Sequence, residues 1–262
     1  MTKTKLADGI FQYAFPPGRD GGIFGNTIVA IIDGGEAMLI DTAYPEEAIQ
    51  VKDDLAASGI AVEKIIISHF HSDHYYGVQE FPDIPYYGGD RFEETLVSEG
   101  HDEGHIKEAA PKLVVDQPTT IDFGGHILEL IPFVGHAVCT LLVQINNQFV
   151  FVADDILFTT DGRLMVPWLC GPGDRHTLIT RQLAAWGILR QYADYIIIPA
   201  HGPAFDGSKL DKYLDSLTSY LGAIQVANGE ISYEDAVKGC DPPPLNVSFG
   251  DSSWHNHNCA PK

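Results

Sequence analysis

Residues 69–74 (HFHSDH) concentrate side chains that can bind metal ions. They follow directly on the apolar run KIIIS, which predicts a short buried strand. Because side chains two apart in an extended segment point the same way, His69 and His71 are expected to face one point. A turn then carries Asp73 and His74 toward a second point, so the segment can serve two ions. The alternative, a solvated polar loop, is disfavoured because α/β proteins place their sites at the C-terminal ends of strands.

The residues before this segment predict alternating strands and helices. An apolar run at 28–32, an Asp-Gly-Gly turn and a second apolar run at 37–40 are typical of a β-hairpin. Pro45 and the two glutamates after it mark the start of a helix, which Gly59 ends. This stretch therefore predicts a hairpin, a helix and then the strand that carries HFHSDH.

The rest of the chain predicts a second set of strands and helices. Strands are expected at 127–131, 141–145, 149–153 and 195–198, and helices near 91–97, after Asp174, over 210–224 and from Ser232. Asn146-Asn147 is typical of a hairpin turn. Two successive groups of strands, each followed by a helix and a strand, predict one domain with two packed sheets and helices outside. The polar tail after Asp241 is expected to be irregular.

HFHSDH resembles the HxHxDH motif of the metallo-β-lactamase superfamily. One earlier segment and three later segments also match motifs of this family, in the family's order. Gly135-His136 is similar to the family's third Gly-His element. Asp155, in VADDILF, is similar to the aspartate of the family's GD motif. His201, in PAHGP after an apolar run, matches the terminal P-x-H-G element, and Asp41 in LIDTAY matches the early IDTG aspartate.

This resemblance implies a fold and a ligand set. The fold is α/β, a four-layer αββα sandwich of two mixed sheets flanked by helices. Residues 1–262 would form a single domain with a C-terminal helical extension from about 209. The implied ligands are His69, His71 and His136 for a first ion, Asp73, His74 and His201 for a second, and Asp155 as the bridge between them. Asp41 would accept a hydrogen bond from a ligand histidine, orienting it and fixing its tautomer.

One departure from the family pattern concerns the bridging aspartate. The GD glycine is replaced by Asp154, so two adjacent aspartates compete for one role. Alignment to the apolar residues ILF that follow favours Asp155. Asp154 would then point to the opposite side if the segment is extended.

The resemblance also implies a reaction. Two divalent ions sharing a water lower its pKa toward neutrality and supply hydroxide. Asp73 is the carboxylate placed to carry a proton to the leaving group. The complete set with a bridging aspartate resembles the hydrolase branch, which predicts a metal-dependent hydrolase of a small-molecule ester, thioester or lactone. The alternatives are a phosphodiesterase or nuclease, and a metal-binding regulatory protein without turnover. Zn²⁺ is the default metal, with Fe²⁺ or Mn²⁺ as alternatives because the ligands are all nitrogen and oxygen.

Residues outside the motifs carry weaker predictions. Trp168 and Leu169 lie in a loop expected over the metal face, where they would line the substrate site or form a small local core; neither reading is favoured. The remaining histidines are expected at the surface rather than as ligands: His101, His105, His126, His176, His255 and His257.

The amino-acid composition limits the classes of partner that the chain is expected to bind. The 262 residues include 16 basic and 36 acidic side chains, a net charge of −20, which argues against nucleic acid and anionic membranes as partners. A small-molecule substrate is expected, and homo-oligomer formation is left open. The first residues lack the apolar segment of a secretory signal, and four scattered cysteines are typical of reduced thiols. A cytoplasmic protein is therefore expected, with a Cys240–Cys259 bridge as the open alternative.

Overall fold

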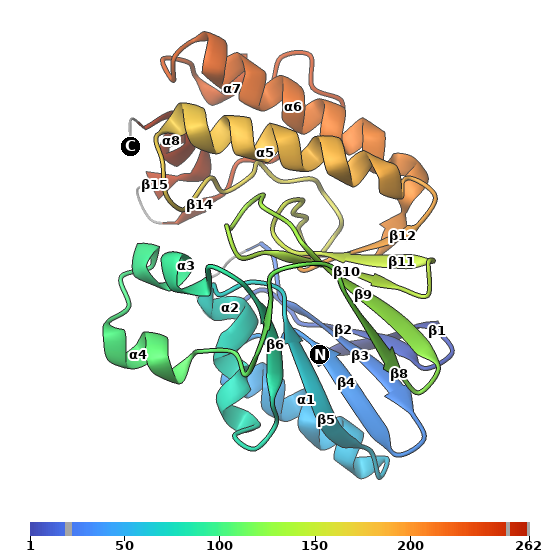
Figure 1. The fold of residues 1–262 in the computed structure, drawn as a ribbon. Coiled ribbons are helices and arrows are strands. Elements are labelled where there is room, and N and C mark those ends of the chain that lie inside the picture. The colour runs from blue at the N-terminus through green and yellow to red at the C-terminus, as the bar shows by residue number, and fades with distance from the viewer. Residues whose placement is uncertain (19–22, 250–251, 261–262) are drawn as a thin grey trace.

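Two β-sheets lie face to face in the computed structural model, which describes residues 1–18, 23–249 and 252–260 (Figure 1). The first sheet has seven strands in chain order: β1 (Thr2–Ala7), β2 (Ile10–Ala14), β3 (Thr27–Asp33), β4 (Glu36–Ile40), β5 (Ala61–Ile67), β6 (Tyr86–Gly89) and β7 (Leu113–Val115). Pairing is antiparallel from β1 to β4 and parallel from β4 to β7.

The second sheet has six strands in the order β13-β12-β11-β10-β9-β8. Their bounds are β8 (Thr119–Phe123), β9 (His126–Pro132), β10 (Leu141–Ile145), β11 (Phe149–Val152), β12 (Ile196–Pro199) and β13 (Phe205–Asp206). Only β11 and β12 pair in parallel, so both sheets are mixed.

Helices cover the outer faces of the two sheets. Helix α1 (Pro45–Ala57) lies on the first sheet, and α5 (Arg175–Leu189) and α6 (Leu210–Val226) lie on the second (Figure 1). The shorter helices are α2 (Ser72–Tyr75), α3 (Phe92–Ser98), α4 (Glu103–Glu108), α7 (Tyr233–Ala236) and α8 (Trp254–Cys259). The predicted αββα sandwich is thereby confirmed.

Alternation along each strand divides the core into three layers of apolar side chains. On β10, Leu141 and Val143 enter the cluster between the sheets, whereas Leu142 enters the cluster beneath α5 and α6. On β3, Val29 points between the sheets and Ile28 toward α1. This two-residue period lets each sheet bury both faces.

Several local predictions are confirmed. β3 and β4 form the expected hairpin, and Pro45 opens α1. Asn146 and Asn147 join β10 to β11, each with a φ of 53°, which asparagine tolerates better than most residues. Asp174 caps α5 by accepting a hydrogen bond from the Thr177 N–H.

The prediction of an irregular tail after Asp241 is wrong. This part of the chain contains the short strands β14 (Ser248–Phe249) and β15 (Ser252–Ser253), followed directly by α8. Among the described residues, no helix is both long and apolar enough to cross a membrane. The single domain with a helical extension from about 209 stays a prediction; α6, which begins at Leu210, shares one apolar cluster with α5.

Candidate metal centre

The residues of the candidate centre lie just beyond the ends of strands. His69 follows β5 by two residues, Asp154 follows β11 by two, and His201 follows β12 by two. Because β11 and β12 are parallel, with Val152 opposite Pro199, Asp154 and His201 emerge side by side. The sheets meet at this point, where the Leu141 N–H donates to the Ser68 carbonyl.

Three histidines form the first group. His71 Nδ1 lies 3.0 Å from His69 Nε2 and 2.9 Å from His136 Nε2. Oδ2 of Asp154 lies 3.6 Å from His136 Nε2 and 3.9 Å from His69 Nε2. All four side chains are buried. One nitrogen from each ring therefore converges on one point, as a shared ion requires.

Asp73, His74 and His201 form the second group. His74 Nε2 lies 3.6 Å from Asp73 Oδ1, and His201 Nε2 lies 3.5 Å from Asp73 Oδ2. The other oxygen of the Asp154 carboxylate, Oδ1, lies 3.3 Å from His74 Nε2 and 3.2 Å from His201 Nε2. Asp154 therefore turns one oxygen toward each group.

Unpartnered atoms indicate that this arrangement suits divalent ions. Among the described residues, three buried side-chain atoms lack a hydrogen-bond partner: His74 Nε2, Asp154 Oδ1 and Asp155 Oδ2. Leaving such an atom unpaired costs about 1–3 kcal/mol. The first two face each other across the second group, where a cation would satisfy both. Nitrogen and carboxylate donors of this kind fit Zn²⁺, Fe²⁺ or Mn²⁺.

The electrostatics of the two groups differ. Burial lowers the pKa of His136 to about 3 and holds the pKa of His69 well below its usual value. Burial also lowers the pKa of His74, but the Asp154 and Asp73 carboxylates outweigh it and raise that pKa well above its usual value. Burial opposes the charged form of Asp154, yet His74 and His201 hold the pKa of Asp154 well below its usual value. The first group thus offers neutral imidazoles, and Asp154 a carboxylate.

The prediction that Asp155 faces the metal site is wrong. Its Oδ1 accepts hydrogen bonds from the His136 N–H at 2.7 Å and from Gln182 Nε2 at 2.9 Å. Gly135 makes room for it, since a Cβ there would lie 1.8 Å from Asp155 Oδ1. Burial raises the pKa of Asp155 to about 7. Asp154 and Asp155 lie in a turn that follows β11, and this turn places Asp154 in the centre and Asp155 under the His136 loop.

Asp41 orients His74, as the sequence prediction expects of a carboxylate beside a ligand histidine. His74 Nδ1 donates to Asp41 Oδ2 at 2.8 Å, which leaves Nε2 to face the centre. Asp41 also accepts from the backbone N–H and the hydroxyl of Ser68. Its φ of 60° lies in the left-handed region, where aspartate is enriched. Ser68 is the residue before His69, so Asp41 ties both ends of the HFHSDH segment together.

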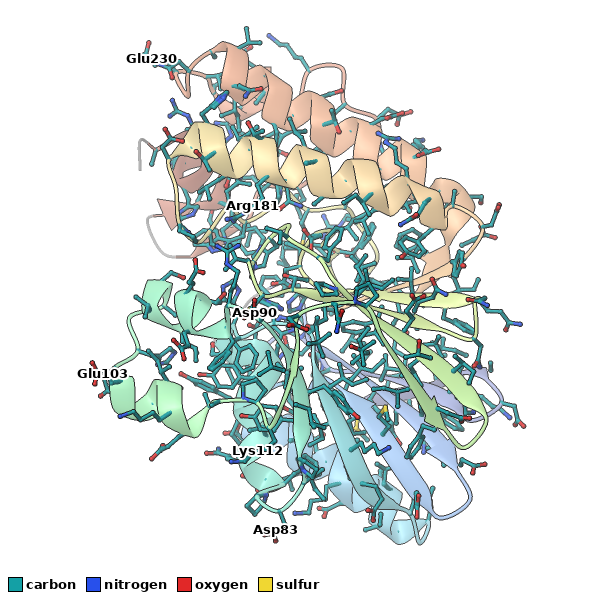
Figure 2. The ribbon with its side chains drawn as sticks, viewed as in Figure 1. Asp83, Asp90, Glu103, Lys112, Arg181 and Glu230 are labelled. Carbon is teal, nitrogen blue, oxygen red and sulfur yellow. The ribbon has the colours of Figure 1, made fainter. Side chains whose placement is uncertain are left out.

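Backbone carbonyls hold two further rings. His136 Nδ1 donates to the Trp168 carbonyl at 2.9 Å, and His201 Nδ1 to the Gly25 carbonyl at 3.2 Å. Arg181 of α5 donates to the carbonyls of Gly135 and His136, and Figure 2 shows it reaching down from α5. The His136 loop is therefore held from both sides.

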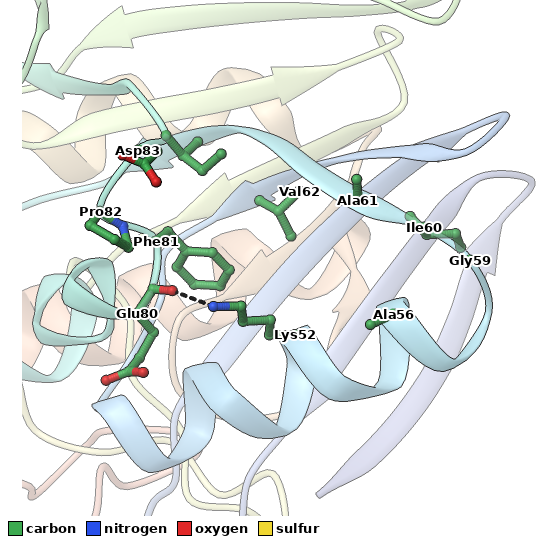
Figure 3. Close-up of a pocket in the computed structure, with 11 residues that line it drawn as sticks. Lys52, Ala56, Gly59, Ile60, Ala61, Val62, Glu80, Phe81, Pro82 and Asp83 are labelled. Carbon is green, nitrogen blue, oxygen red and sulfur yellow. Dashed lines mark hydrogen bonds between the residues drawn. The ribbon is translucent and has the colours of Figure 1, made fainter.

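A cavity of about 220 Å³ opens onto the centre. Its lining residues are Phe24, His71, Ser72, Asp73, Glu99, Asp154, Trp168, His201 and Trp254. A second cavity, of about 680 Å³, shares Phe24 and Asp73 with it. A third, of about 440 Å³, lies between α1 and the segment before β6, around Lys52 and Phe81 (Figure 3), and none of its described lining residues belongs to the centre.

Of the two predicted substrate contacts, one lines the smaller cavity and the other does not. Trp168 is half-buried and lines it, whereas Leu169 is buried in the apolar cluster beneath α5 and does not. Sequence reasoning missed Phe24, Glu99 and Trp254. Only Trp254 left a signal, as the single tryptophan in the polar tail after Asp241.

The other histidines and the cysteines lie outside both ligand groups. His255 was expected at the surface, but it is buried and hydrogen-bonded to the Tyr220 hydroxyl, so that prediction is wrong. No disulfide joins any two of the four cysteines, all of which the structure describes, so Cys240 and Cys259 do not pair. Cys170 lies beneath the first group, with its Sγ 3.8 Å from His71 Nε2.

Comparison with known proteins supports the fold described above. A family model described as the metallo-beta-lactamase superfamily matches residues 20–201. The chain is similar to a metallo-beta-lactamase from Pontibacter korlensis, with a TM-score of 0.64 and 19% identity over 83% of this chain and 98% of that one. It is also similar to the DIM-1 metallo-beta-lactamase exposed to ceftazidime, with a TM-score of 0.63 and 19% identity over 83% and 95%. Such low identity shows a shared fold alone. No curated protein sequence matches the chain.

Proposed function

The chain belongs to the metallo-β-lactamase superfamily, and from that premise we propose that it is a dinuclear metal-dependent hydrolase of a small-molecule ester, thioester or lactone. The observation that carries the proposal is the Asp154 carboxylate, which turns one oxygen to each ligand group. The proposed ligands are His69, His71 and His136 for one ion, Asp73, His74 and His201 for the other, and Asp154 as the bridge.

The chain's own residues have separate parts in this reaction. Divalent ions held there would lower the pKa of a shared water and polarise a substrate oxygen. Asp73 lines both cavities that adjoin the centre, so its carboxylate can pass a proton to the leaving group. Asp41 and the Trp168 carbonyl keep His74 and His136 in position. Burial of the first group excludes bulk water from these contacts.

The charge of the cleft favours acyl substrates over phosphodiesters. Among the described residues that line the two adjoining cavities, none is lysine or arginine, whereas Glu46, Glu47 and Glu99, which lie outside the proposed ligand set, are acidic. Nucleic-acid binding relies on basic side chains that neutralise phosphates. The net charge of −20 likewise disfavours binding of a polyanionic nucleic acid.

Protein purified without chelator from metal-supplemented culture is expected to contain about two divalent ions per chain, because two ligand groups share one carboxylate. Inductively coupled plasma mass spectrometry on the folded protein measures this directly. Zinc is the expected ion, with iron or manganese compatible with the same donors. A metal-free, correctly folded protein would contradict the proposal.

A panel of activated esters, thioesters, lactones, β-lactams and bis(p-nitrophenyl) phosphate tests the substrate class. At least one acyl substrate is expected to show metal-dependent turnover that His71→Ala removes. His176→Ala, an exposed histidine on α5, is the matched control and should leave turnover unchanged. If the phosphodiester is cleaved far more efficiently than every acyl substrate, the acyl assignment is wrong and a phosphodiesterase replaces it.

A further inference from the structure

The C-terminal segment 252–259, formed by β15 and α8, returns to the mouth of the candidate metal centre. The His257 ring stacks on Trp168 with ring centroids 3.6 Å apart and an angle of 13° between the planes. Its Nε2 donates to the Leu169 carbonyl at 2.6 Å. Asn258 donates to the Pro167 carbonyl and accepts from the Leu169 N–H. The segment therefore holds the loop 167–169, whose Trp168 carbonyl in turn holds His136.

Buried polar contacts attach the same segment to the rest of the protein. His255 contacts the Tyr220 hydroxyl of α6 at 3.0 Å through Nδ1 and the Ile231 carbonyl at 2.9 Å through Nε2. His255 and Asn258 are both buried. Breaking such contacts would leave buried polar groups unpaired, so the segment has one defined position.

Trp254, the first residue of α8, completes a row of aromatic rings beside the centre. Its ring centroid lies 5.4 Å from that of Trp168 and 5.6 Å from that of Phe24. Phe24 in turn makes an edge contact with His201, at 4.9 Å between centroids. We call Phe24, Trp168 and Trp254 the aromatic wall. It extends from the loop that supports His136 to His201, and all three residues line the smaller cavity.

The remaining lining residues of this cavity are polar or acidic. They include Asp73, Asp154 and Glu99, whose Oε1 lies 3.6 Å from His71 Nε2. A volume of about 220 Å³ is smaller than the ~300–1,000 Å³ of pockets that hold whole drug-sized ligands. The cavity therefore suits one ring-sized group of a substrate, with the rest of the molecule directed toward the larger cavity.

We propose that the C-terminal segment is a specificity element of the hydrolytic site, in which Trp254, with Phe24 and Trp168, binds an uncharged aromatic ring of the substrate beside the metal centre. His257 covers one face of Trp168 and Trp254 is 7% exposed, so a bound ring would contact the remaining edges and faces of the aromatic wall, and such contacts favour a flat apolar group. Glu99, the acidic lining residue outside the proposed ligand set, disfavours an anionic one. The assignment rests on the proposed acyl hydrolysis, because it places the ring next to the bond that is cleaved.

The test compares phenylacetyl and acetyl thioesters that share one leaving group, using the metal-loaded full-length protein. Trp254→Ala is expected to lower kcat/KM for the phenylacetyl substrate at least about tenfold, and to change the acetyl value less than about threefold. Trp254→Phe, which keeps a ring, should recover most of the loss. Equal losses for both substrates, or no loss for either, would overturn the proposal.

A binding measurement keeps this test separate from the proposed function. N-methylbenzamide is neutral and aromatic, and its binding can be followed by saturation-transfer NMR whether or not any ester is cleaved. Trp254→Ala should weaken binding at least about tenfold without changing metal content. Phe11→Ala, a half-buried aromatic on β2 outside all three cavities, is the matched control and should bind normally. Turnover of no acyl substrate together with Trp254-dependent binding would overturn the reaction but keep the aromatic site; binding unchanged by Trp254→Ala would overturn the site.

Discussion

Asp154→Asn is expected to lower turnover of any acyl substrate ~100-fold or more and to remove one of the two ions. The amide keeps one oxygen but replaces the other with a nitrogen that has no lone pair to donate. It therefore cannot serve both groups, which now face Asp154 Oδ1 and Oδ2 at 3.2–3.9 Å. Metal analysis and kcat/KM on the same preparation measure the two effects together.

Asp155→Asn is the matched control for this change, one residue along the chain and identical in chemistry. The amide oxygen can still accept from the His136 N–H and from Gln182, as Asp155 Oδ1 does. Metal content should remain near the wild-type value, and turnover should fall much less than in Asp154→Asn. The opposite ranking, with Asp155→Asn losing metal and Asp154→Asn retaining it, would restore the assignment suggested by the sequence motif.

Asp41→Ala is expected to weaken metal binding by about 10–100-fold, the usual effect of removing a partner that orients a ligand histidine. His74 Nδ1 loses its acceptor, so the ring is free to rotate away from Asp154 and Asp73. The buried Ser68 N–H and hydroxyl also lose their acceptor, which should cost about 1–3 kcal/mol in the free energy of unfolding. Chelator competition measures the first effect and urea unfolding the second.

Asp41→Asn separates the side-chain effect from the backbone effect at this position. Asparagine tolerates the φ of 60° that alanine disfavours, and its oxygen can still accept from His74. Its amide nitrogen then faces the Ser68 N–H, so two hydrogen-bond donors point at each other and neither is satisfied. An intermediate loss of metal affinity is expected. If Asp41→Ala binds metal as tightly as the wild type, Asp41 does not orient His74 for binding.

Local sequence was sufficient to predict the candidate ligands that lie at strand ends. His69, His71, Asp73 and His74 lie within six residues after an apolar run, and this spacing alone places them at two nearby points. The chain order of motifs brought in His136 and His201, and the structure joins them to the same groups. The sequence could indicate this grouping because a strand end and a short turn are set by neighbouring residues.

Tertiary structure alone decided between Asp154 and Asp155. The two aspartates are adjacent and chemically identical, and a shift of one residue reverses which side chain faces the centre. The pairing of β11 with β12, which sets Val152 opposite Pro199, determines that Asp154 emerges beside His201. Motif alignment contains no information about this register, so it selected Asp155, which the structure places outside both ligand groups.

Tertiary structure also decided the position of the C-terminal segment 252–259. The tail has few apolar residues, and its local pattern predicts an irregular segment. Its order depends on partners far away in the chain, such as the hydrogen bond from the Leu169 N–H to Asn258, 89 residues later. The sequence by itself therefore determined the αββα fold and the ligand-bearing strand ends, through local periodicity and motif order. The position of the Asp154 carboxylate between the two ligand groups, and the aromatic wall, depend on contacts between segments that are distant in the sequence. No local sequence pattern encodes such contacts.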